Sequence, residues 1–156
     1  MIEAVGHEYL DDYFRACSAL LAPDGMMVLQ AITIADQHHD KHRKSVDFIK
    51  EYIFPGSCIP SVTSMITSAT RVTDLRLSQL EDLTLDYART LRFWRERFLD
   101  RLPEVRRLGF DESFIRMWEY YLAYCEGAFE ERYLGCVHML FTKPDARPSL
   151  RTGRQP

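Results

Sequence analysis

The stretch Leu20–Ile34, LLAPDGMMVLQAITI, decides the fold class of this chain. It closes a segment from Glu8 to Ala22 whose apolar residues recur at helical spacing, so a helix is predicted there. The turn sequence Pro23–Gly25 then ends that helix. The run Met26–Ile34 is almost entirely apolar, which is typical of a strand covered on both faces in a parallel sheet. Helix, turn and buried strand in this order predict an α/β protein.

The remaining elements follow from the same kinds of pattern. Polar residues 36–47 and the aromatic, proline-containing stretch after them indicate an insertion. Asp111 is placed to cap a helix, because its carboxylate can accept hydrogen bonds from first-turn amides. The elements predicted after the insertion are a helix at 61–73, a strand at 75–83, helices at 87–102 and 110–129, and a strand at 134–142.

The order of these elements indicates that part of a domain is missing. The pattern begins on a helix directly after Met1–Glu3, with no earlier strand, and no G-x-G sequence occurs in the chain. A doubly wound α/β domain that binds a nucleotide-like cofactor has both features. We therefore expect Met1 to lie inside a domain, residues 1–143 to form a partial domain, and residues 144–156 to be a polar, disordered tail.

Composition narrows the class of protein. The chain has 156 residues, of which 46% are hydrophobic and 28% are charged, with a net charge of −3. This is enough for one domain with a real core, and the acidic balance argues against a nucleic-acid partner. Four scattered cysteines without a C-x-x-C pair suggest free thiols. With neither a signal peptide nor an apolar run of about 20 residues, a cytoplasmic protein is expected.

Four further segments carry a resemblance to a known family. They are MIEAVGHEYLDDYF (1–14), DFIKEYIFPGSCIPS (47–61), YARTLRFWRERF (87–98) and RMWEYYLAYCEGAF (116–129). Together with residues 20–34 they resemble the cyclopropane-fatty-acyl-phospholipid synthases, and EAVGHEY, VLQAITI and WEYYLAYC are most similar to plant-type members. The resemblance runs from about Met1 to Lys143 but corresponds to only the C-terminal half of the family's catalytic domain.

The resemblance implies a fold, two cofactors and a reaction. The fold is α/β, namely the C-terminal half of a Rossmann-like class I methyltransferase sheet with a helical insertion and cap, without the N-terminal cofactor-binding strands. S-adenosylmethionine is then expected to bind upstream of Met1. The reaction is methylenation of the cis double bond in an unsaturated phospholipid acyl chain, which gives a cyclopropane after bound bicarbonate takes a proton. Such chemistry needs a dry slot and aromatic faces that stabilise positive charge.

Two residues correspond to catalytic positions of the family. Glu3, in the E-x-V-G segment, matches the acidic residue that holds bicarbonate. Tyr87, in the segment Y-x-x-T-L-x-x-W, matches the tyrosine whose hydroxyl reaches the same anion. From the residues alone, a solvated carboxylate near the N-terminus is the favoured interpretation of Glu3, and spacing does not decide whether Tyr87 is a core residue of an amphipathic helix.

Four more positions complete the site that the resemblance implies. The backbone of Ile32 is expected to contact bicarbonate. Gln30 stands where many members have histidine; its amide can donate to an anion but cannot exchange a proton near neutral pH. Tyr121 and Cys125, one helical turn apart, are expected to line the acyl and methyl-transfer slot. Aromatic core packing explains Tyr121 equally well from spacing alone.

The histidines of the insertion suggest no metal site. His38, His39 and His42 lack an H-E-x-x-H signature and a clear third ligand, so we interpret this segment as a solvated, mobile loop. Its mixed charge, with aromatic residues close by, favours a surface that rests on lipid headgroups.

The sequence supports one main hypothesis for function and two alternatives. The main hypothesis is a cyclopropane synthase-like lipid methyltransferase, peripheral to the membrane, of which this chain is the C-terminal part and inactive alone. The alternatives are a related enzyme that adds a methyl branch, and a non-catalytic fragment that binds lipid or protein. A homo-oligomer is left open.

Overall fold

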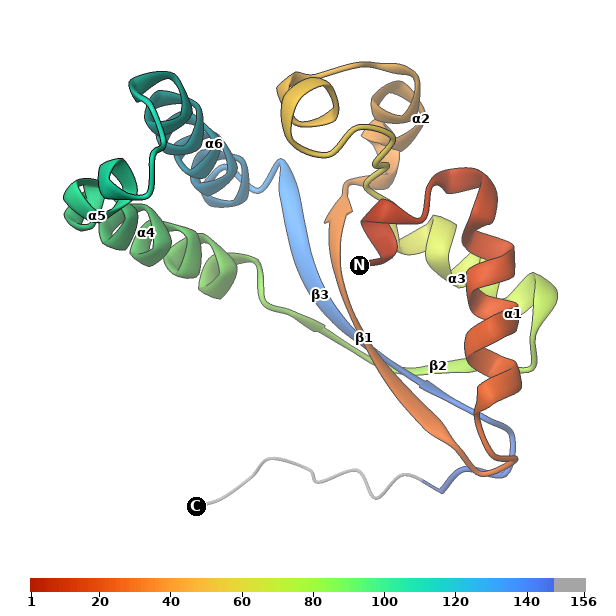
Figure 1. Cartoon of the computed structure of the whole chain (residues 1–156). Coiled ribbons are helices and arrows are strands. Elements are labelled where there is room, and N and C mark those ends of the chain that lie inside the picture. Colours follow the sequence, from red (N-terminus) through yellow and green to blue (C-terminus); the bar gives the residue numbers. More distant parts are fainter. Residues whose placement is uncertain (148–156) are drawn as a thin grey trace.

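The computed structural model describes residues 1–147, which form a small sheet with helices on both faces (Figure 1). The expected tail, residues 144–156, is described only as far as residue 147; residues 148–156 lie outside the described part. In chain order the elements are the short helices η1 (Ile2–Ala4) and η2 (His7–Tyr9), α1 (Leu10–Leu20), β1 (Met26–Ile34), α2 (Asp36–Lys44), the π-helical η3 (Ile49–Ile53), α3 (Val62–Val72), β2 (Arg76–Asp82), α4 (Thr84–Asp100), α5 (Leu102–Arg107), α6 (Glu112–Glu130) and β3 (Leu134–Thr142).

The sheet has the order β1-β3-β2, and β3 is antiparallel to both neighbours. The expectation of parallel pairing around Met26–Ile34 is therefore wrong for the pairings that residues 1–147 make. An apolar run indicates that a strand is buried. It does not indicate the direction of the neighbouring strand, here β3, which follows about a hundred residues later in the chain. Burial is also incomplete, since Val28 is 64% exposed. The strands predicted at 75–83 and 134–142 are confirmed as β2 and β3.

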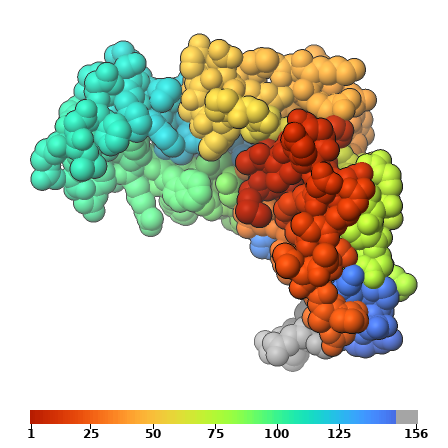
Figure 2. All heavy atoms as spheres, turned by 45° about the vertical axis from the view of Figure 1, so that its right-hand side comes forward, coloured from red at the N-terminus to blue at the C-terminus, as the bar shows by residue number. Residues whose placement is uncertain are grey.

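Two separate cores lie on the two faces of the sheet. On one face α1 and α3 cover Leu29 and Ala31 of β1, with Phe14 fully buried between them and β3. On the other face α4 and α6 pack over Cys136 of β3 and the half-buried Ile32. Figures 1 and 2 show α4, α5 and α6 as an arm that projects away from the N-terminal segment. A site can therefore form around the end of β1, where Ile32 contacts η1 through its amide and the helices α4 and α6 through its side chain.

Local signals explain where several helices begin and end. Asp111 caps α6, because its carboxylate accepts from the Phe114 amide at 2.8 Å, as predicted. Ser61 and Ser64 form a reciprocal capping box at the start of α3. The Pro23–Gly25 turn joins α1 to β1, with the Gly25 amide donating to Ala22 at 2.8 Å. The Lys143 amide in turn donates to Gly25 O at 2.9 Å, which attaches the end of β3 to this turn.

The polar insertion differs from its prediction. Residues 36–44 form the helix α2 rather than a mobile loop. His39 and His42, three residues apart, bury together on one face, with 7% and 6% exposure, while His38 is exposed and stacks on Tyr133. The high charge of this segment concealed a helix whose buried stripe consists of imidazoles instead of aliphatic side chains. Within residues 1–147 no helix is long and apolar enough to cross a bilayer.

Candidate active site

Glu3 lies at the outer edge of the sheet. The helix η1 places its side chain, which is only 18% exposed, against β1. Its Oε1 accepts a hydrogen bond from the Ile32 amide at 2.6 Å, and its Oε2 accepts from the Met1 ammonium at 2.7 Å. The Glu3 carbonyl also accepts from the Cys58 amide at 2.8 Å. Glu3 is therefore a fixed carboxylate rather than a solvated one, and the Ile32 amide binds Glu3 where an anion contact was expected.

Tyr87 faces the same region from α4. Its ring packs edge-on against Phe129, with ring centroids 4.9 Å apart, and against Trp94 at 6.3 Å. Burial raises the pKa of the Tyr87 hydroxyl, and nearby Cys136, Cys125 and Glu3 raise it further. No side-chain hydrogen bond within residues 1–147 involves the Tyr87 hydroxyl, which is not among the fully buried polar atoms that lack a partner and therefore reaches solvent. Tyr87 thus presents a neutral, uncommitted donor near the Glu3 carboxylate.

Tyr121 and Cys125, both on α6, pack in the same cluster as Tyr87 of α4. Burial raises the pKa of Tyr121 to about 12 and that of Cys125 to about 11, and the two side chains form a hydrogen bond with each other. Edge-on rings of Phe54 and Trp118 flank Tyr121 at 6.3 and 5.3 Å. These groups are uncharged near neutral pH, so they line an aromatic, apolar wall and supply no thiolate nucleophile.

Gln30 lies on β1, two residues before Ile32. It is exposed and shares the face of Ile32, because alternate strand residues point to the same side. Its Oε1 is 3.0 Å from Nε2 of His138 on β3. The structure thus brings Glu3, Ile32, Tyr87, Tyr121 and Cys125 together and places Gln30 at the open end of the same row, joined to a histidine.

Sequence reasoning missed three residues of this region. They are His138 beside Gln30, Cys136 beside Ile32, and Tyr13, whose pKa burial raises to about 12 with smaller contributions from Cys17 and Glu3. His138 and Cys136 alternate along a strand, which is a detectable pattern, but their neighbours on β1 are more than a hundred residues away. Only the register of β1 against β3 could have revealed that His138 and Cys136 lie beside Gln30 and Ile32.

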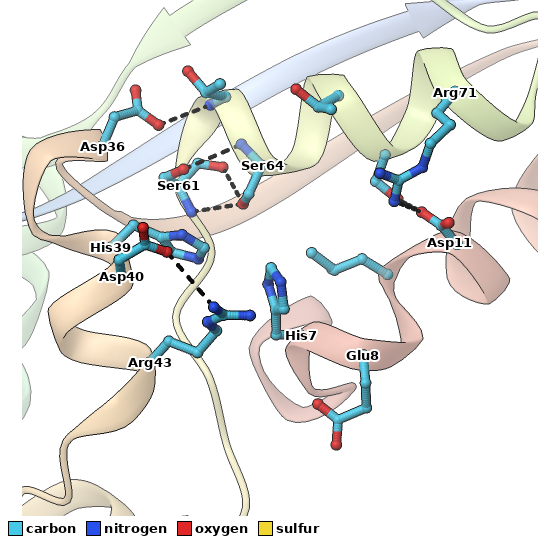
Figure 3. Close-up of a pocket in the computed structure, with 14 residues that line it drawn as sticks. His7, Glu8, Asp11, Asp36, His39, Asp40, Arg43, Ser61, Ser64 and Arg71 are labelled. Carbon is cyan, nitrogen blue, oxygen red and sulfur yellow. Dashed lines mark hydrogen bonds and ion pairs between the residues drawn. The ribbon is translucent and has the colours of Figure 1, made fainter.

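A hollow lies between η2, α2 and α3 (Figure 3). It has a volume of about 490 Å³, and its arginines are paired: Arg71 with Asp11 at 2.7 Å and Arg43 with Asp40 at 3.7 Å. Burial lowers the pKa of His39, and His7 lowers it further. Within residues 1–147 no three His, Cys, Asp or Glu side chains are placed to hold a metal ion. This hollow contains none of the predicted site residues.

The residues present are only part of what S-adenosylmethionine would need. The cluster around Glu3 and Tyr87 offers aromatic walls and hydrogen-bonding groups, but the chain has no glycine-rich turn after a strand to hold such a cofactor. The residues fit bicarbonate better. The Tyr87 hydroxyl and the Gln30 amide are uncommitted donors among residues 1–147, and Glu3 is an acceptor for the hydroxyl of that anion.

The α/β architecture of the described residues is similar to that of solved cyclopropane synthases. The chain matches the mycolic acid cyclopropane synthase CmaA1, complexed with SAH and CTAB, with a TM-score of 0.80 and 26% identity, over 90% of this chain and 52% of that one. The sequence model described as "Mycolic acid cyclopropane synthetase" matches residues 1–139. The chain belongs to this family, which confirms the resemblance and the fold class predicted from the sequence.

Two curated relatives are similar over most of this chain. The tuberculostearic acid methyltransferase UfaA1 of Mycobacterium tuberculosis is 44% identical over 134 residues, which are 86% of this chain and 31% of that protein. The cyclopropane-fatty-acyl-phospholipid synthase of Escherichia coli K12 is 35% identical over 144 residues, 92% of this chain and 36% of that protein. The chain therefore spans about a third of the length of these relatives.

Proposed function

We propose that this chain forms the acceptor side of an enzyme that transfers a one-carbon unit from S-adenosylmethionine to the cis double bond of a phospholipid acyl chain, giving a cyclopropane. The observation that carries the proposal is the position of Glu3. Its carboxylate is held on the Ile32 amide at 2.6 Å, near the uncommitted Tyr87 hydroxyl. A carboxylate and a neutral donor at one place can hold a small hydrogen-bonding anion such as bicarbonate.

Each residue has a part in this proposal. The rings of Tyr87, Trp94 and Phe129 stabilise the positive charge that develops on the acyl chain, because aromatic faces attract cations. The Tyr87 hydroxyl and the Gln30 amide donate to bicarbonate, and Glu3 accepts from it. Bicarbonate, when bound, supplies the base that takes the proton released as the ring closes. Tyr121 and Cys125 exclude water from the slot, since both are neutral and half-buried.

The insertion provides the contact with the membrane in this proposal. The last turn of α2 carries Lys41, Arg43 and Lys44. Beside it, Val46, Tyr52 and Phe54 are 72%, 65% and 52% exposed. Basic side chains next to exposed apolar ones suit the surface of an anionic bilayer. Residues 41–54 are called the insertion surface below.

A second candidate reaction is addition of a methyl branch. It is favoured by the 44% identity to a relative named tuberculostearic acid methyltransferase. Both reactions begin with methyl transfer to the alkene, and they differ in where the cation loses its proton: from the transferred methyl group with ring closure, or from a neighbouring chain carbon, which leaves a methyl-branched alkene for a separate reductant to saturate. The groups around Glu3 suit the first outcome, because they hold a base where the proton leaves.

The test uses this chain joined to the part of the E. coli synthase that precedes the region similar to it, called the joined enzyme below. The joined enzyme is incubated with methyl-labelled S-adenosylmethionine and vesicles of mono-unsaturated phospholipid, and the acyl products are identified by mass spectrometry. We expect label in a cyclopropane. Label in a methyl branch supports the second candidate. No label with a correctly folded joined enzyme supports a non-catalytic lipid- or protein-binding fragment. The chain alone is run in parallel.

A further inference from the structure

A hydrogen bond between two strands links Gln30 to a histidine. Gln30 on β1 lies directly opposite His138 on β3, with His138 Nε2 3.0 Å from Gln30 Oε1. An amide oxygen can only accept, so His138 Nε2 carries the hydrogen and donates it in this arrangement. The two N–H groups of the Gln30 amide have no partner among residues 1–147. Gln30 therefore has its acceptor end bound and its donor end uncommitted.

This pair adjoins the strand position that holds Glu3. The next pair on the same face of the two strands is Ile32 with Cys136, two residues or roughly 7 Å along. The Ile32 amide donates to Glu3, and Cys136 belongs to the buried cluster that includes Tyr87. The exposed pair Gln30–His138 and the more buried pair Ile32–Cys136 are therefore neighbours on one face of the sheet. The groups proposed to hold bicarbonate lie beside the second pair.

We propose that His138 is a positioning residue that turns the donor end of the Gln30 amide toward the bicarbonate site, an inference that rests on the proposed function. A glutamine on an open strand face has several rotamers and can present either end of its amide. If the oxygen faced the anion, the contact would be repulsive. The donor on His138 favours the orientation in which the Gln30 oxygen points to β3 and the N–H groups point away. His138 thereby converts an ambiguous side chain into a directed donor.

A neighbour on the third strand offers a matched control. Glu81 on β2 lies opposite His138 on its other side and is exposed. It makes no hydrogen bond with His138 in the described part of the chain. Glu81→Gln therefore alters the charge next to His138 and leaves the bond to Gln30 in place. A purely structural role of that bond would change the melting temperature without changing anion binding.

The experiment titrates the full 156-residue chain with sodium bicarbonate at constant pH in sealed tubes, with sodium chloride at equal ionic strength as the reference. The signals are the side-chain amide resonances of Gln30 and the imidazole nitrogens of His138, observed by NMR. The variants are His138→Leu, which removes the donor; His138→Gln, which retains one; and Glu81→Gln, the matched control. The same titrations are repeated in the joined enzyme, with the bicarbonate dependence of turnover as the readout.

We expect His138→Leu to weaken bicarbonate binding roughly two- to tenfold, the range for loss of one hydrogen bond. His138→Gln should remain within about twofold of the wild type, because its side-chain amide still offers an N–H to the Gln30 oxygen. Glu81→Gln should also be unchanged. Wild-type affinity in His138→Leu would overturn this proposal alone. If neither the chain nor the joined enzyme responds to bicarbonate while the His138 resonance still reports its bond to Gln30, both this proposal and the anion site of the proposed function are wrong.

Discussion

At the scale of single residues, the candidate site depends on neutral groups placed around one carboxylate. Tyr87, Tyr121, Cys125 and Cys136 all have a raised pKa, and burial is the first cause in each case. Near neutral pH the hydroxyls and thiols therefore keep their protons. Such a site suits a reaction whose cation must not meet a nucleophilic side chain. The thiols would otherwise be alkylated.

Tyr87→Phe should reduce turnover of the joined enzyme by about one to two decades while leaving its melting temperature unchanged. The substitution removes a hydroxyl without a protein partner and keeps the ring that packs on Phe129. Loss of a hydrogen bond to a charged ligand in a dry site costs about 1–3 kcal/mol. Tyr120→Phe is the matched control, because Tyr120 is 52% exposed on the same arm. Full activity of Tyr87→Phe would make Tyr87 a packing residue.

Gln30→His should be tolerated and Gln30→Leu should not. Both glutamine and histidine can present an N–H from the same strand position, whereas leucine fits the volume and leaves the anion without that donor. The expected cost for leucine is about 1–3 kcal/mol, seen as a higher bicarbonate concentration for half-maximal rate in the joined enzyme. Equal rates and equal bicarbonate dependence in all three proteins would show that residue 30 does not face the anion.

At the scale of secondary-structure elements, the arm of α4 and α6 depends on one carboxylate. Glu126 on α6 is 8% exposed and accepts from Arg92 and Arg95 of α4, each at 2.8 Å. Burial by itself would raise the pKa of Glu126, but hydrogen bonds from Arg95 and Arg92 outweigh it and lower the pKa. The ion pairs of Glu126 with these two arginines therefore join α4 and α6, the helices that position Tyr87 and Tyr121.

Glu126→Gln should lower the free energy of unfolding by about 1–3 kcal/mol, less than for a fully buried pair because both arginines are partly exposed. Glu130→Gln is the control. Glu130 also pairs with Arg92 but is 43% exposed, so its loss should cost at most about 1 kcal/mol. Denaturant unfolding measures both values. Equal losses in the two variants would contradict a special role for Glu126.

The same pair gives a pH dependence with a definite sign. A carboxyl whose pKa is lower in the folded state contributes stability that is present above its unfolded pKa, about 4.3, and is lost as pH falls through the folded pKa. The difference in unfolding free energy between wild type and Glu126→Gln should therefore be constant near pH 7 and shrink below about pH 4. A difference that stays constant down to pH 3 would exclude this origin.

The insertion surface should make vesicle binding depend on lipid charge. Lys44→Glu combined with Val46→Asp should reduce co-sedimentation of the chain with anionic vesicles by roughly tenfold, because it removes a basic and an apolar contact together. Residues 44 and 46 are exposed, so folding should be unaffected. Leu108→Asp is the control, since Leu108 is 77% exposed on the distant arm. Equal binding by all three proteins would place membrane contact elsewhere.

The accuracy of sequence-based prediction differed between elements for physical reasons. Helices α1, α3, α4 and α6 and all three strands were predictable, because apolar periodicity and capping residues are local signals. The helix α2 was missed, since its buried stripe is made of histidines. The antiparallel pairing of β1 with β3 could not be predicted, because strand direction and register depend on segments far apart in the chain.

The candidate site was predictable only in part. Glu3, Ile32, Tyr87, Tyr121 and Cys125 were identified through motifs of the family, and periodicity alone left Tyr87 and Tyr121 as core residues. No motif pointed to His138, whose importance comes from the residue opposite it on β1. The hydrogen bond from the Ile32 amide to Glu3 was likewise invisible, because it depends on how η1 folds back on the strand edge.

At the scale of the whole molecule, this chain is similar to 52% of the solved CmaA1 chain. β1 is an edge strand in this sheet, and Val28 and Met26 on it are 64% and 48% exposed. An apolar, unpaired strand edge is a surface that soluble proteins usually cover. The exposed edge of β1 is therefore a surface on which a further strand or another chain could pack.

The isolated chain should bind S-adenosylmethionine weakly or not at all. A nucleotide-like cofactor on an α/β sheet is held by a glycine-rich turn and by an acidic residue after the second strand, and this chain contains no G-x-G sequence. Isothermal titration calorimetry of residues 1–156 should show no saturable binding below about 1 mM, whereas the joined enzyme should bind in the micromolar range, a difference of about 4 kcal/mol. Circular dichroism of the isolated chain guards against an unfolded sample. Micromolar binding by the folded chain alone would mean that the groups around Glu3 and Tyr87 hold the cofactor themselves, and the assignment of this half to the acyl acceptor and bicarbonate would then be wrong.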